Sequence, residues 1–102
     1  MKIIQIAVDY NGKIIIKDIP IVKETAKQLK VDRNSNTQYR EIINKSELGI
    51  LNESYGKVYI FCEEDNKNKA VTKVQEHYEK YREQIKQKLH NVNNILSKLK
   101  NI

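Results

Sequence analysis

Five arginine and tyrosine residues of this sequence could together hold an anionic ligand. They are Arg33, Tyr39, Arg40, Tyr55 and Arg82. Planar guanidinium groups donate paired hydrogen bonds to phosphate, and a tyrosine ring stacks on a nucleobase. A sheet face that gathers the first four would bind a nucleotide or an anionic partner, whereas Arg82 falls in the expected C-terminal helix and would come from a neighbouring subunit. The plainer interpretation, which we favour, is that Tyr55 fills a turn and the charges are solvated.

The residue types that serve catalysis and metal binding are not grouped in this way. His77 and His90 would lie about 20 Å apart along one helix, too far to share a metal ion. The acidic run 63–65 sits where the start of a helix favours negative charge, so we interpret it as a helix-terminus feature. The glycines are isolated, which leaves no phosphate-binding loop. We therefore expect no enzymatic activity, no metal site and no cofactor.

A heptad pattern over the last third of the chain predicts the element that assembles the molecule. Of its ten a and d positions only Lys88 is not apolar. Such a repeat indicates a helix from about Asn66 to the end, with one stripe buried against another helix or a sheet. A break near Asn91–Asn94 is the less favoured alternative. The a positions are Val71, Tyr78, Ile85, Val92 and Leu99, and the d positions are Val74, Tyr81, Lys88, Ile95 and Ile102.

The length of this helix predicts an overhang. At 1.5 Å per residue it would span roughly 50 Å, whereas a compact module of about 65 residues is about 28 Å across. Its far end therefore needs another cover, and a second copy of the chain is the simplest one. The expected oligomerisation residues are Tyr78, Tyr81, Ile85, Leu89, Val92, Ile95, Leu96 and Leu99.

The first part of the chain is rich in β-branched residues. Residues 2–19 predict a β-hairpin around Asn11-Gly12, a dipeptide that suits a type I′ turn. Successive isoleucines at 14–16 point to alternate faces, so we expect this strand to be covered on both sides or curled into a small barrel. The segment 21–31 fits a strand or a helix, and we favour a strand.

Two more strands are expected at 39–43 and 57–62, with a turn at 45–49 and a loop at 52–56. The expected fold class is α+β. Residues 1–65 would form a small antiparallel sheet or SH3-like barrel of about five strands, and residues 66–102 one long helix for oligomerisation. The two parts would make a single structural domain.

The net charge and the single cysteine limit which partners and which cellular compartment we expect for this chain. The net charge is +6, and nine basic and six acidic residues in the first 50 positions against ten and seven in the rest give each half +3. The charge is thus not clustered, and AT-rich codon use explains part of it. Cys62 is alone in an apolar run, which predicts a packing role. No apolar run is long enough to span a membrane, so we expect a cytoplasmic protein.

The order of an NGK hairpin, the segments YREIINKSELG and GKVYIF, and a terminal helix rich in lysine and glutamate resembles a known group. These are the small β-barrel-plus-helix proteins of phages and prophages of AT-rich Gram-positive bacteria. Most have no assigned function. Some small phage proteins of similar design block host immunity, by binding an effector such as a CRISPR nuclease complex or by sequestering a nucleotide immune signal, as the anti-Thoeris sponge does. The resemblance implies a location in the host cytosol.

Three functions are therefore expected. The first is a non-enzymatic inhibitor that binds a host defence protein or ribonucleoprotein through its basic β face and assembles with itself through the helix. The second is an oligomeric sponge that holds a cyclic nucleotide signal where Arg33, Arg40 or Arg82 from neighbouring subunits meets an aromatic ring. The third is a nucleic-acid-binding accessory protein.

Overall fold

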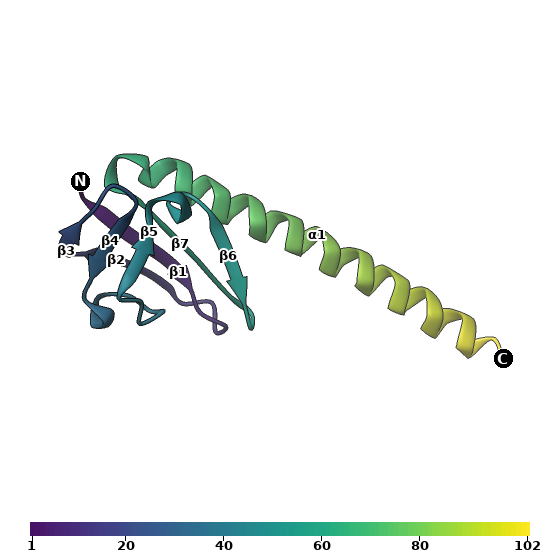
Figure 1. Cartoon of the computed structure of the whole chain (residues 1–102). Helices are drawn as coiled ribbons and strands as arrows, with labels where there is room; N and C mark the ends of the chain where they lie inside the picture. Colours follow the sequence, from purple (N-terminus) through teal and green to yellow (C-terminus); the bar gives the residue numbers. More distant parts are fainter.

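The computed structural model describes all 102 residues as an α+β fold in which seven strands precede one long helix (Figure 1). One antiparallel sheet has the strand order β2-β1-β7-β6, and a second has the order β3-β4-β5. The α+β class is thus confirmed, with two sheets and seven strands where one sheet of about five was expected. The strands are β1 (Ile3–Val8), β2 (Ile14–Ile19), β3 (Ile21–Glu24), β4 (Gln28–Val31), β5 (Ile42–Asn44), β6 (Leu51–Ser54) and β7 (Lys57–Glu63). The helices are η1 (Arg33–Ser35), η2 (Lys45–Glu47), η3 (Glu64–Asn66) and α1 (Lys67–Lys100). We call residues 3–63 the β module.

The expected hairpin forms from β1 and β2, but its turn is not type I′. That turn needs a positive φ at both central residues, and in Asn11-Gly12 only the glycine has one, at 85°. The carboxylate of Asp9 instead accepts hydrogen bonds from the backbone N–H groups of Asn11 and Lys13, at 2.9 and 2.8 Å. These hydrogen bonds to the Asp9 side chain stabilise a loop that is longer than the two-residue turn predicted from Asn11-Gly12.

The segment 21–31 is extended, as favoured, but it forms a hairpin and not one strand. β3 pairs with β4 in antiparallel register. Between them the Thr25 hydroxyl accepts a hydrogen bond from the backbone N–H of Gln28 at 3.0 Å. Threonine hydroxyls stabilise turns by such local bonds, and this is why the run reverses direction.

Two other expected boundaries are wrong. Residues 52–54 of the expected loop belong to the edge strand β6, and the type I′-like turn lies after them, where Tyr55 and Gly56 have φ of 51° and 75°. The strand expected from Tyr39 begins at Ile42, because Tyr39 has a φ of 53° and lies in the preceding loop. A left-handed tyrosine is uncommon, so neither turn was visible in the residue types.

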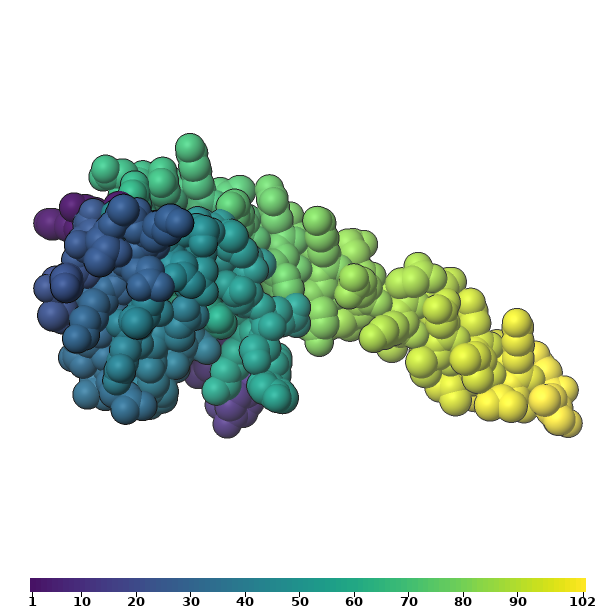
Figure 2. All heavy atoms as spheres, viewed as in Figure 1, coloured from purple at the N-terminus to yellow at the C-terminus, as the bar shows by residue number.

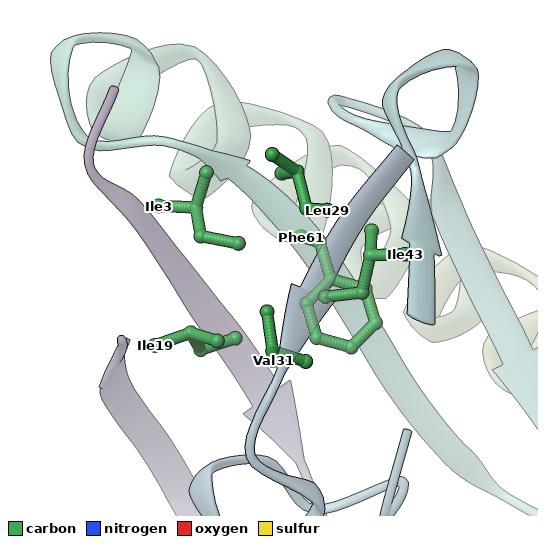
Figure 3. Close-up of a cluster of buried hydrophobic side chains, with 6 residues drawn as sticks. All are labelled: Ile3, Ile19, Leu29, Val31, Ile43 and Phe61. Atoms are coloured by element: carbon green, nitrogen blue, oxygen red, sulfur yellow. The ribbon is translucent and has the colours of Figure 1, made fainter. Parts of the chain in front are cut away.

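The two sheets pack face to face over the first of two apolar cores (Figure 3). The larger sheet contributes three of its side chains and the smaller sheet the other three. All six are at most 3 % exposed: Ile3, Ile19, Leu29, Val31, Ile43 and Phe61. This core helps to position the connection between β4 and β5, because Leu29, Val31 and Ile43 on these two strands belong to it.

The second core lies on the other face of the larger sheet, under the start of α1. Ile4, Ile6, Ile60 and Cys62 pack there against Ala70. The thiol of Cys62 is 1 % exposed, in agreement with the expected packing role, and burial raises its pKa. After η3 the chain reverses, so α1 returns along β7 with β1 and β6 on either side.

The helix then continues beyond the sheets without a break at 91–94. The molecule measures 67 × 23 × 21 Å, and the last part of α1 stands clear of the β module (Figure 2). The expected overhang is therefore present. No helix is long and apolar enough to cross a membrane.

One edge of the larger sheet lacks the cover that was expected. Ile14 and Ile16 on β2 are 68 % and 49 % exposed. They stand opposite Val8 and Ile6 on β1, and so share the sheet face on which α1 lies. The prediction that this strand is covered on both sides is wrong, because α1 lies over β7 and does not reach the β2 edge.

Candidate functional site

The apolar stripe of α1 is only partly covered by the rest of the chain. Val71 and Val74 pack on the second core, and Tyr78 is half-buried at the end of the β module. From there on the same stripe has no cover within the chain. Seven of its side chains are 48–58 % exposed, and we call them the distal seam: Tyr81, Ile85, Leu89, Val92, Ile95, Leu96 and Leu99.

The cover ends at Tyr78. Burial raises the pKa of its hydroxyl, and the negative charges of Glu53 and Asp9 add to this effect. The neighbouring His77 ring stands edge-on to it with 5.2 Å between ring centroids, and the His77 Nε2 lies 3.7 Å from a carboxylate oxygen of Glu53. The approach of His77 to Glu53 joins α1 to the end of β6, and the residues after it project past the sheet.

An apolar groove adjoins this point of the helix. It has a volume of about 550 Å³ and lies between β2 and α1. Seven of its nine lining residues are hydrophobic. The hydrophobic lining consists of Ile6, Val8, Ile14, Ile16, Val71, Val74 and Tyr78. We call it the β2 groove. The heptad pattern does not predict this groove, because its existence depends on how far α1 reaches across the sheet.

The expected anion-binding residues do not form one site. Arg33, Tyr39 and Arg40 share the connection between β4 and β5. Arg40 donates to both carboxylate oxygens of Glu47, at 3.0 and 2.8 Å, and to the carbonyl of Ile42 at 3.2 Å. The Arg40 guanidinium is therefore hydrogen-bonded within the connection. Glu47 is itself held in place, because it also accepts a hydrogen bond from the backbone N–H of Asn44.

The other arginines are more exposed and are separated. Arg33 lies 3.9 Å from the Glu41 carboxylate, with its side chain 61 % exposed. Arg82 lies on α1, five residues after the helix meets Glu53 through His77. No contact brings Arg82 to Arg33 or to Tyr39.

Tyr39 and Tyr55 share an unusual conformation. They are the two non-glycine residues with positive φ, and they are 66 % and 97 % exposed. Such a backbone costs about 1 kcal/mol or more for a residue other than glycine. Tyr55 fills a turn, in agreement with the favoured interpretation, and both rings project into solvent at loop tips.

Two lysines lie side by side on the outer face of the smaller sheet, which was not apparent from the sequence. Lys23 on β3 pairs with Lys30 on β4, and Lys30 pairs with Ile42 on β5. Directly paired residues point to the same face, and here that face is the outer one, away from the first core. Neither lysine takes part in an ion pair. Only the strand register could have grouped these residues.

No protein-family model, no curated protein and no solved structure matches this chain.

Proposed function

We propose that this chain is a non-enzymatic interaction protein that assembles with itself through the distal seam and thereby presents two or more β modules to a partner. The observation that carries the proposal is the exposure of seven large apolar side chains along one stripe of α1. Contiguous apolar surface of this kind is typical of protein interaction sites.

The free energy involved favours assembly. Full burial of one such side chain is worth about 1.5–3 kcal/mol, so covering seven half-exposed ones yields roughly 5–10 kcal/mol per copy. That is comparable with the whole stability of a small domain, about 5–15 kcal/mol. Most of the stability of a helix in a protein comes from packing of its apolar face, so assembly would also stabilise the distal half of α1 itself.

The proposed partner of the β modules is the host defence protein or ribonucleoprotein that the phage-protein resemblance implies. Two surface features support an anionic partner: the lysines Lys23 and Lys30, which pair with no acidic residue, and the exposed rings of Tyr39 and Tyr55. Binding through lysines should weaken as salt rises, because it releases counterions. The nucleotide-sponge function needs two free arginines beside one ring, and no observation favours it, since Arg40 is held by Glu47.

Sedimentation equilibrium tests the assembly. The wild-type chain should sediment as a dimer or higher oligomer at micromolar concentration, and Ile95→Asp with Leu99→Asp should sediment as a monomer. The matched control is Asn93→Asp with Ser97→Asp, which adds the same charge in the same turns on the opposite side of the helix. A monomeric wild type, or equal dissociation by both double variants, would sink the proposal.

A further inference from the structure

We infer that the β2 groove is the docking site for the distal half of α1 from a second copy, so that two chains form an antiparallel helix pair with one β module under each end. The inference rests on the proposed assembly through α1 and specifies its geometry. Each copy would then complete the other's apolar layer over the larger sheet.

The spacing of the sheet fits a second helix at this place. α1 lies over β7, and β2 is the second strand away from it. Neighbouring strands are about 4.8 Å apart, which places β2 about 10 Å from the line of α1. Packed helices have axes about 8–10 Å apart. A helix seated beside α1 would therefore lie directly above β2, where Ile14 and Ile16 are exposed.

A second copy of this chain carries the surface that such a groove requires. The groove needs an apolar helix, and the distal seam is an apolar helix face that needs a cover. Both surfaces belong to one chain and lie at opposite ends of the same helix. A two-fold axis across the middle of α1 would bring each distal seam into the other copy's groove in one self-complementary contact.

The helix face on the β2 side has the right residues. Val71, Gln75 and Tyr78 line the β2 groove, and they are a and e positions, whereas Lys69 and Lys73 line a hollow on the other side of α1. Continued along the helix, the a and e row becomes fully apolar in the distal half. It consists there of Ile85, Leu89, Val92, Leu96 and Leu99. This row would contact the partner helix.

The d row then accounts for Lys88. In α1 the d position Val74 points to the chain's own sheet. An antiparallel pair centred near Gln87 would direct Ile95 and Ile102 at the β2 groove of the other copy, because two-fold symmetry keeps both modules on one side of the helix pair. Lys88, the one polar d residue, falls in the gap between the two modules and faces water.

Disulfide trapping tests the arrangement. The pair Ile14→Cys and Ile95→Cys should link two chains under mild oxidation. Ile14 shares the groove with Tyr78, and Ile95 is about 26 Å further along the helix, so a bond within one chain is excluded. Both native side chains are more than half exposed, so neither change removes a core contact. Cys62 is buried and stays reduced.

The control pair is Ile14→Cys with Asn93→Cys, since Asn93 lies two residues before Ile95 on the far side of the helix. We expect it to form covalent dimer at least tenfold more slowly. Equal rates for the two pairs would overturn the inference, as would a dimer by sedimentation in which Ile14→Cys and Ile95→Cys do not react. Rapid linkage of Leu99→Cys alone would also overturn it, because that variant reports parallel helices. A wild type that sediments as a monomer would instead reject the assembly itself.

A second comparison is independent of cysteine chemistry. Ile16 on β2 and Ile42 on β5 are 49 % and 48 % exposed. Ile16→Glu should raise the dissociation constant of the dimer at least tenfold, and Ile42→Glu should change it less than twofold. Equal effects of the two changes would contradict a role for the β2 groove.

Discussion

The two halves of α1 carry one continuous apolar repeat but have different surroundings. In the proximal half, Val71 and Val74 pack on the sheet, and Ala70 is small enough to let the helix approach it closely, with 2 % of its surface exposed. In the distal half, Ile95 and Leu99 occupy the same kinds of position and are 56 % and 57 % exposed. A heptad pattern thus predicts that a stripe is covered, and the rest of the chain decides what covers it.

The two halves of α1 also differ in what their apolar side chains stabilise. The proximal half belongs to the folding unit, because it closes the second core over Ile4 and Ile60. The distal half contributes nothing to that core, and its apolar surface is available for association. Changes in the two halves should therefore separate folding from assembly.

The largest expected effect is loss of the fold. Removal of residues 66–102 should leave a chain with no cooperative unfolding transition, since Ile4, Ile6, Ile60 and Cys62 would lose their cover. Removal of residues 85–102 should leave the β module folded, because the contacts of His77 and Tyr78 remain. Dispersion of amide signals in NMR spectra distinguishes the two. A folded chain of residues 1–65 would show that α1 is only an appendage.

Core truncation should show the same contrast on a smaller scale. Phe61→Ala removes a ring that is 1 % exposed between the sheets and should cost about 3–5 kcal/mol of unfolding free energy. Leu89→Ala, at 58 % exposure, should cost less than about 1 kcal/mol when measured at concentrations too dilute for assembly. Urea denaturation followed by circular dichroism provides both values. Similar costs would mean that the distal helix packs on its own β module.

The thiol of Cys62 reports whether the proximal half of α1 stays docked. Burial raises its pKa, so less of the reactive thiolate is present at any given pH. We expect maleimide to modify Cys62 at least about a hundredfold more slowly than a cysteine placed at exposed Ser97. Comparable rates in the folded protein would show that α1 opens readily from the sheet.

The smallest expected effect concerns the arginines of the β4–β5 connection. Arg40→Ala should lower the unfolding free energy by about 1–2 kcal/mol, because it removes the two hydrogen bonds that the guanidinium donates to the Glu47 carboxylate. Arg33→Ala, whose ion pair is long and exposed, should lower it by less than about 0.5 kcal/mol. Thermal melts of the two variants give the comparison. Equal stability would return Arg40 to the list of residues free to bind a partner.

The elements that follow from the sequence are those with a strong local pattern. The hairpin of β1 and β2 and the length of α1 could be predicted because β-branched runs and a heptad repeat specify them without distant contacts. The turns could not, since Asp9 competes with Asn11-Gly12 through side-chain hydrogen bonds, and Tyr55 adopts a left-handed conformation that tyrosine rarely takes.

The surfaces depend on tertiary arrangement and were predicted less well. The distal seam was visible as a stripe, because periodicity alone defines it. The β2 groove was not, since it exists only where α1 stops short of the sheet edge. The partner of Arg40 was also hidden: Glu47 is seven residues away in a separate short helix, and only the folded connection brings the two together.

Hydrogen exchange along α1 tests the central claim most directly, because it reads the two halves of the helix in one experiment. Amides of residues 70–80 should be protected in both the wild type and the variant with Ile95→Asp and Leu99→Asp, since their cover is intramolecular. Amides of residues 85–99 should be protected in the assembled wild type, and the double variant should lose that protection. Distal protection that is the same in the wild type and in the double variant would contradict the account.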